Sequence, residues 1–120
     1  MLLLKHELKE LPLLAVDLEY HNALPGEEGC VIISLIQIST HKTDYIFDCF
    51  MLRNHMREDR GLANIFGDPE VLKILHGCDS DLKYIIADLK MVMVNLFDTA
   101  RGMAYVTRVT PYEMVKKSQM

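Results

Sequence analysis

The segment at residues 30–39, CVIISLIQIS, constrains the fold more than any other part of the chain. It is β-branched and apolar at positions that would point to both faces of a strand, without the alternation of a half-exposed strand. Such a run is typical of a strand inside a sheet that is buried on both sides. With 120 residues, of which 50% are hydrophobic, the chain can build one core around this strand.

Two further segments read as strands beside this one. Residues 13–20, LLAVDLEY, follow Pro12 and precede a loop at 22–26, and residues 45–50, YIFDCF, follow a turn at 41–44. Because the connections between these strands are short, the sequence predicts an antiparallel meander of three strands.

Beyond residue 50 the apolar period changes to that of helices. Helical patterns cover residues 2–10, part of 51–66, 81–89 and a last segment to about residue 106, with short strands at 71–75 and 91–97. N-caps are expected at Asp79 or Ser80 and at Asp98 or Thr99. We therefore predict an α/β domain at residues 1–109, in which a βαβα part extends the meander into a mixed sheet with helices on both faces, and a polar tail at 110–120.

Composition limits the kinds of partner and compartment. The formal net charge of −4 argues against a nucleic-acid partner when taken alone, although bound divalent cations can reverse the local field. Three widely spaced cysteines without a CxxC pair favour a reducing, intracellular compartment over a disulfide framework. No apolar run approaches the roughly 20 residues of a membrane-spanning helix, so no membrane partner is expected.

Asp17 and Glu19 are the first candidates for chemistry. Alternate residues of a strand share a face about 7 Å apart, so these two carboxylates stand side by side in a segment otherwise suited to burial. Their mutual repulsion requires a positive partner, and hard divalent cations prefer carboxylate oxygens. The alternative is an exposed strand end on which both acids are solvated or paired with Lys or Arg.

Asp81 is the third candidate, within HGCDSDLKYI at residues 76–85. It falls in the first turn of a helix, where the helix dipole alone would explain an acid. It also lies just beyond the carboxyl end of the strand at 71–75, which is where open α/β sheets place their sites. If that strand lies beside residues 13–20, the three carboxylates meet and could bind a divalent metal.

Several of these segments together resemble one family. LLAVDLEYH, GCVIISLIQIST, TDYIFD, VLKILHGCDSDLKYI and NLFDT, in this order over residues 13–107, are similar to the RNase D family of DEDD 3′–5′ exonucleases, in particular the branch that supplies the exonuclease of the nuclear exosome. The resemblance implies a ribonuclease H-like fold and two-metal hydrolysis with Mg²⁺ or Mn²⁺. It also implies the 3′ end of single-stranded RNA, or less readily DNA, as substrate, an RNA-processing complex as partner, and the nucleus as location.

The resemblance also assigns roles by position. Asp17 corresponds to the acid that bridges both metals, Glu19 to a ligand of the metal that activates water, and Asp81 to the acid associated with the second metal. His76 belongs to the lead-in of the second motif, and a packed or capping role is expected for it in place of metal binding.

The chain departs from the family at its third motif, a Tyr followed four residues later by an Asp, which lies beyond the point where this sequence stops. Neither Tyr105 nor Tyr112 has an Asp at that spacing, and Tyr84 with Asp88 belongs to the helix of the second motif, where a surface pair is expected. The resemblance thus implies a C-terminally incomplete domain with impaired catalysis, prone to self-association through its uncovered side. A non-catalytic remnant that binds nucleic acid or protein, or a fragment completed by another chain, are the alternatives.

Overall fold

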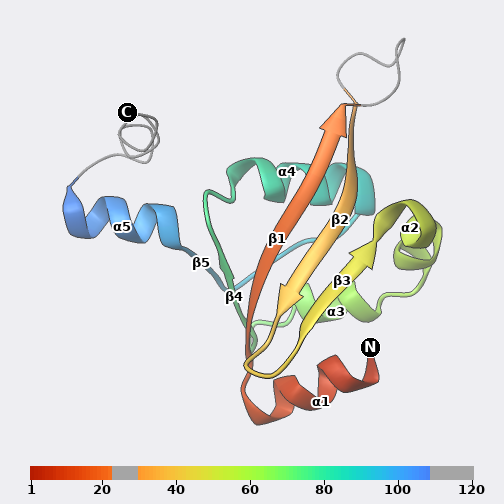
Figure 1. Ribbon diagram of the computed structural model, residues 1–120, viewed down its shortest axis with the longest axis horizontal. Coiled ribbons are helices and arrows are strands. Elements are labelled where there is room, and N and C mark those ends of the chain that lie inside the picture. Colours follow the sequence, from red (N-terminus) through yellow and green to blue (C-terminus); the bar gives the residue numbers. More distant parts are fainter. Residues whose placement is uncertain (23–29, 109–120) are drawn as a thin grey trace.

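A computed structural model describes residues 1–22 and 30–108, and its centre is a five-stranded mixed sheet in the order β3-β2-β1-β4-β5 (Figure 1). The strands are β1 (Leu13–Asn22), β2 (Val31–Ser39), β3 (Asp44–Asp48), β4 (Leu72–Leu75) and β5 (Leu96–Asp98). β1, β2 and β3 form the predicted antiparallel meander, β4 is parallel to β1, and β5 is parallel to β4. The loop predicted after Asn22 and the tail predicted at 110–120 lie outside the described residues.

Five helices accompany the sheet in the described part of the chain: α1 (Leu2–Glu10), α2 (Cys49–Glu58), α3 (Gly61–Phe66), α4 (Asp79–Leu89) and α5 (Thr99–Thr107). α2, α3 and α4 lie behind the sheet in the view of Figure 1, whereas α5 extends away from it past β5. Within these residues no helix combines the length and apolar character that crossing a bilayer requires.

Three element boundaries differ from the sequence prediction. β3 ends at Asp48 because its carboxylate caps α2, accepting hydrogen bonds from Phe50 N (3.0 Å) and Met51 N (3.2 Å). α4 begins at Asp79, two residues before the predicted start, and its N-cap is Cys78 in place of Asp79 or Ser80. The strand predicted at 91–97 is reduced to β5, because the buried residues at its start pack into the core without pairing to β4.

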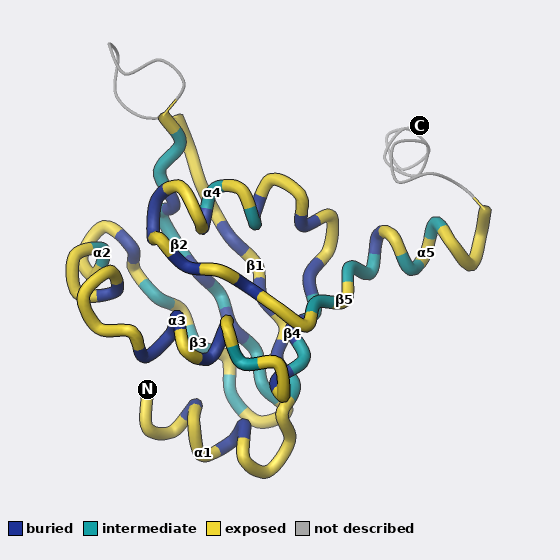
Figure 2. The backbone as a smooth tube through the Cα atoms, turned by 180° about the vertical axis from the view of Figure 1, so that it is seen from behind, coloured by how far each residue is buried: buried dark blue, intermediate teal, exposed yellow. Residues whose placement is uncertain are grey.

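The core lies on one face of the sheet. Leu14, Val16 and Leu18 of β1 are buried there, and the register places Ile36 and Ile38 of β2 beside them. Figure 2 shows the same alternation of buried and exposed residues along the strands.

The opposite face is open in the described structure. Ala15 is exposed there, together with Ile46 (70% exposed) and Phe97 (51% exposed). The mixed α/β architecture is thus confirmed, but the prediction that residues 30–39 are buried on both sides is wrong for β2. Its inward residues are buried and its outward ones only partly covered, because the described helices cover one face.

α1 is held by a polar anchor as well as by its apolar residues. The buried Glu7 carboxylate accepts hydrogen bonds from Thr40 Oγ1 (2.6 Å), Thr43 Oγ1 (2.6 Å) and Tyr45 OH (2.9 Å). These bonds outweigh the effect of burial and lower the pKa of Glu7. The anchor ties α1 to the β2–β3 turn at the end of the sheet remote from Asn22.

Candidate metal centre

Two of the predicted acids lie on a part of β1 that pairs with β2 but not with β4. β1 pairs with β2 from Ala15 to Asn22, but with β4 only from Leu13 to Ala15. Beyond Ala15 the chain of β4 turns away into α4, so this edge of β1 has no strand partner. Asp17 and Glu19 are exposed on this part of β1 and, as predicted, share a face opposite Val16 and Leu18.

Asp98, at the end of β5, fixes the turn that leads from β4 into α4. Its carboxylate accepts hydrogen bonds from Gly77 N (2.9 Å) and Cys78 N (3.1 Å), and also from Ala100 N (2.9 Å) as the predicted cap of α5. Burial raises the pKa of Asp98, but these bonds outweigh it and lower that pKa to about 2. Gly77 has φ +65°, which an L side chain rarely adopts, and this turn places Asp81 in the first turn of α4.

His76 takes part in the same turn in the capping manner that was expected. Its Nδ1 lies 2.8 Å from Thr99 Oγ1, and Thr99 Oγ1 donates to Leu75 O at 3.1 Å. Since the hydroxyl proton is used on Leu75, Nδ1 is the donor to Thr99. His76 therefore stabilises the junction of β4 with α5.

The carboxyl group of Asp81 is buried and lies close enough to the other acids for their negative charges to affect its pKa. It is only 8% exposed, and its pKa is raised to about 6, first by burial and then by the charges of Asp17, Asp98 and Glu19. Because the charges of Asp17 and Glu19 both act on Asp81, the three predicted carboxylates share one local electrostatic environment.

The three carboxylates are neighbours without forming a closed ligand set. In residues 1–22 and 30–108, no three His, Cys, Asp or Glu side chains converge closely enough to hold one ion. Over the same ranges, none of Asp17, Glu19 and Asp81 forms an ion pair with Lys or Arg. Because Asp17 and Glu19 are exposed, the solvated form of the alternative agrees with the structure and the paired form does not. Their chemistry nevertheless fits Mg²⁺ or Mn²⁺, since hard oxygen donors with mutually repelling charges are what such ions neutralise.

Asp88 has a role that the sequence reasoning missed. It was expected on the surface with Tyr84, but it is 8% exposed and its two carboxylate oxygens are bonded to Arg53 and Arg57 of α2 and to Ile33 N of β2. With both oxygens occupied, Asp88 cannot serve as a metal ligand in place of the third motif. The only signal for it in the sequence is the spacing of the two arginines, which puts them on one face of α2.

The strand order and the parallel β1–β4 pair, with α4 following β4, define a ribonuclease H-like fold. The sequence pattern of the family described as 3′–5′ exonuclease matches residues 3–114, and the chain belongs to that family.

Proteins of this family resemble the chain over most of its length. The Exosome complex component 10 homolog of Drosophila melanogaster is 41% identical over 96 residues, which are 80% of this chain and 10% of that protein. The Exosome complex exonuclease RRP6 of Saccharomyces cerevisiae is 36% identical over 93 residues, which are 78% of this chain and 12% of that protein. The chain thus spans about a tenth of the length of these curated relatives.

Solved structures agree with this assignment. The catalytic core of RRP6 from Trypanosoma brucei aligns with a TM-score of 0.69 and 34% identity, covering 82% of this chain and 26% of that one. The EXD2 exonuclease domain aligns with a TM-score of 0.70 and 27% identity, covering 88% of this chain and 52% of that one. The EXD2 domain has also been solved after soaking in Mg and GMP.

Proposed function

We propose that this chain carries the metal-binding acids of a 3′–5′ exonuclease that hydrolyses the 3′-terminal phosphodiester of single-stranded RNA, or less readily DNA. The observation that carries the proposal is the placement of the acids: Asp17 and Glu19 lie on the part of β1 that β4 does not pair with, and the parallel pairing of β4 with β1 brings Asp81, in the first turn of α4, toward them. Binding of a nucleic acid or protein alone does not require three neighbouring carboxylates, whereas divalent cations are bound by carboxylate oxygens.

The proposed residue roles are those that the resemblance to the family implies. Asp17, next to the point where β4 leaves β1, would hold both ions. Glu19 would hold the ion near the attacking water, and Asp81 the other. Two bound Mg²⁺ or Mn²⁺ ions would supply an activated water and stabilise the leaving oxygen. Asp98 and Gly77 would keep the first turn of α4, and with it Asp81, in place.

We propose that residues 1–109 form the domain that carries this activity, with residues 110–120 as a polar C-terminal tail.

The relatives suggest the wider setting. Because several are named as exosome components, we propose an RNA-processing complex as partner and the nucleus as location. The open sheet face with Ile46 and Phe97, on its two outer strands, is proposed as a surface for self-association, since exposed apolar side chains favour contacts between copies.

A non-catalytic remnant of the family is the second candidate. It is favoured by the failure of the three acids to converge to ligand distances in the described residues, and by the net charge of −4. Such a protein would bind RNA or a protein partner through surfaces other than the acids.

One assay separates the two candidates. The purified chain is incubated with 3′-labelled single-stranded RNA and Mn²⁺, beside Asp17→Asn and the control Asp79→Asn, which changes an exposed acid of the same helix turn as Asp81. If the chain is an exonuclease, the wild type and the Asp79→Asn control release labelled mononucleotide, whereas Asp17→Asn does not. Absence of release by the wild type at every Mn²⁺ concentration would overturn the catalytic proposal and leave the remnant.

A further inference from the structure

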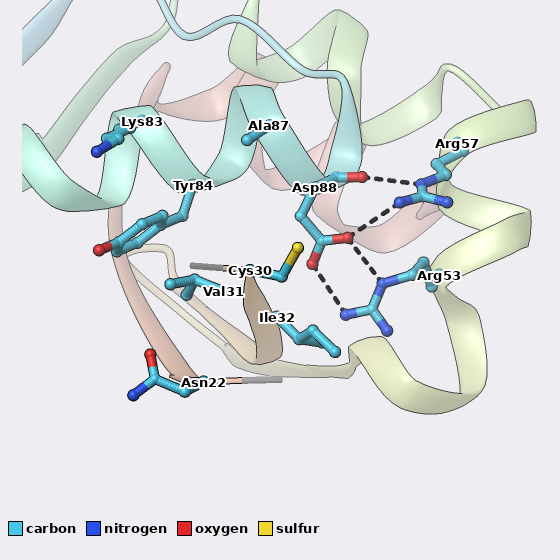
Figure 3. Close-up of a pocket in the computed structure, with 10 residues that line it drawn as sticks. All are labelled: Asn22, Cys30, Val31, Ile32, Arg53, Arg57, Lys83, Tyr84, Ala87 and Asp88. Atoms are coloured by element: carbon cyan, nitrogen blue, oxygen red, sulfur yellow. Dashed lines mark hydrogen bonds and ion pairs between the residues drawn. The ribbon is translucent and has the colours of Figure 1, made fainter. Parts of the chain in front are cut away.

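A cavity of about 660 Å³ lies on the helical side of the sheet, and none of Asp17, Glu19 and Asp81 lines it (Figure 3). It is bounded by the end of β1, the start of β2, and the facing sides of α2 and α4. Its charged and aromatic lining consists of Arg53, Arg57, Lys83, Tyr84 and Asp88.

The two arginines are held rigidly at this cavity. Asp88 Oδ1 accepts from Arg53 Nε (2.9 Å) and Arg57 Nη2 (3.1 Å), and Asp88 Oδ2 accepts from Arg53 Nη2 (2.9 Å). Arg53 Nη2 also donates to Ile33 O (2.6 Å), and Arg57 Nε donates to Asp88 O (2.8 Å). Among the described residues, Nη1 of each guanidinium makes no hydrogen bond, so each arginine keeps donors for a ligand.

The lining of the cavity has a positive net charge, although the net charge of the whole chain is negative. Its lining holds three cations, Arg53, Arg57 and Lys83, and one carboxylate, Asp88, in a chain of net charge −4. Lys83 is exposed, and within the described ranges it pairs with no acid. Rigid guanidinium groups with donors to spare are suited to phosphate oxygens.

An aromatic ring completes the lining. Tyr84 lies between Lys83 and the start of β2 in Figure 3, and its ring packs edge-on against Tyr20 with the centroids 4.6 Å apart. The ammonium group of Lys83 lies 6.0 Å from the centre of the Tyr84 ring. Cations beside a fixed aromatic ring are the elements with which proteins hold the backbone and bases of single-stranded nucleic acid.

The cavity lies on the helical side of the sheet, whereas Asp17 and Glu19 point to the open side, and two elements connect these places. Tyr84 and Asp88 follow Asp81 on α4, at an axial rise of about 5 to 10 Å. Asn22 follows Glu19 on β1 at about 10 Å. A strand whose 3′ end reaches the acids could place an upstream phosphate in the cavity by passing the edge of β1 that β4 leaves unpaired, and attraction there would offset the repulsion from the acid cluster.

We propose that this cavity binds a phosphodiester group of single-stranded nucleic acid, upstream of the 3′ end, through Arg53, Arg57 and Lys83. The proposal deepens the exonuclease function above and rests on it for the direction of the strand. Asp88 is a positioning residue, which holds the two guanidinium groups without touching the ligand.

Binding in EDTA tests this without any hydrolysis. Fluorescence anisotropy is measured with a labelled oligouridylate of about 12 nucleotides, a length in the range such sites cover. Lys83→Glu is compared with Lys9→Glu, which makes the same charge change on an exposed position of α1. Lys83→Glu is expected to weaken binding about 10-fold and to lower the salt dependence by about one counterion, and Lys9→Glu to leave both unchanged.

Three outcomes would overturn the proposal: wild-type affinity in Lys83→Glu, equal weakening in Lys9→Glu, or displacement of the oligonucleotide by equimolar inorganic phosphate, which would assign the cavity to a free anion. Equal melting temperatures of the variants exclude a folding defect, since both side chains are exposed. Lys83-dependent binding without nucleotide release in the Mn²⁺ assay would refute the catalysis alone, and release without Lys83 dependence would refute the cavity alone.

Discussion

Replacing Asp81 by Asn should stabilise the metal-free protein at neutral pH. The pKa of Asp81 in the folded chain is about 6, against an ordinary value of 3.8, because burial and the charges of Asp17, Asp98 and Glu19 disfavour its ionised form. The folded state therefore binds more protons than the unfolded state between these two values. Stability is lost as the pH rises through this window, and the loss is complete above about pH 6.

The size of the effect follows from the shift. A shift from 3.8 to about 6 corresponds to about 3 kcal/mol at pH 7.5 as an upper limit, at about 1.4 kcal/mol per pH unit. Imperfect hydrogen bonding of the new amide reduces the expected gain to about 1–3 kcal/mol, or about 4–12 °C in melting temperature. At pH 4 the electrostatic part of the gain should fall to about a fifth, because Asp81 is protonated in the folded state and half-protonated in the unfolded state.

Thermal unfolding in EDTA at pH 7.5 and pH 4 measures this directly. Asp79→Asn is the control, because Asp79 is an exposed acid of the same helix turn and is paired with Arg101 (2.5 Å). It should be neutral or destabilising by less than about 1 kcal/mol. A destabilised or unchanged Asp81→Asn at pH 7.5, or a gain that is the same at both pH values, would refute the assignment of Asp81 to a shared acidic field.

Three other substitutions test the frame around the site. Asp88→Ala should destabilise by about 1.5–3 kcal/mol in urea titrations, since it removes the charge-assisted hydrogen bonds of the partly exposed Arg53 and Arg57; a loss under about 1 kcal/mol would contradict the anchoring role. Gly77→Ala should destabilise by about 1–2 kcal/mol through its φ of +65° alone, because no heavy atom lies within 4 Å of the added Cβ; a neutral result would mean that the turn relaxes. Ile46→Glu should shift sedimentation velocity profiles toward the monomer, and an unchanged association would exclude the open face as the contact.

The positions of the acids that depend on local sequence periodicity were predictable from the sequence. The alternation of β1 puts Asp17 and Glu19 on one face whatever the rest of the fold does. The strand–Gly–helix order around Gly77 places Asp81 after a strand end, and the parallel pairing of β4 with β1 brings it to those acids, as was predicted conditionally. The proximity is supported by the coupled charges, whereas the ligand roles stay predictions.

The parts that depend on tertiary contacts were not predictable. Nothing in the sequence around Asp88 indicates that α2 delivers two arginines to it, since the partners are more than 30 residues apart. The apolar outward residues of β2 look like buried ones, because a sequence pattern records what can be buried and not which face is covered. The segment from Met91 has the composition of a strand, but its methionines fill the core without a ladder.

Titration with Mn²⁺, followed by the loss of the free-ion signal in electron paramagnetic resonance, tests the acid cluster most directly. Saturable binding is predicted for the wild-type chain and for Asp79→Asn at neutral pH, with strong weakening in both Asp17→Asn and Asp81→Asn. Because the assay needs no substrate, a catalytic defect cannot obscure it. Absence of binding by the wild type, or equal binding by all four proteins, would contradict a divalent-metal site formed by Asp17, Glu19 and Asp81.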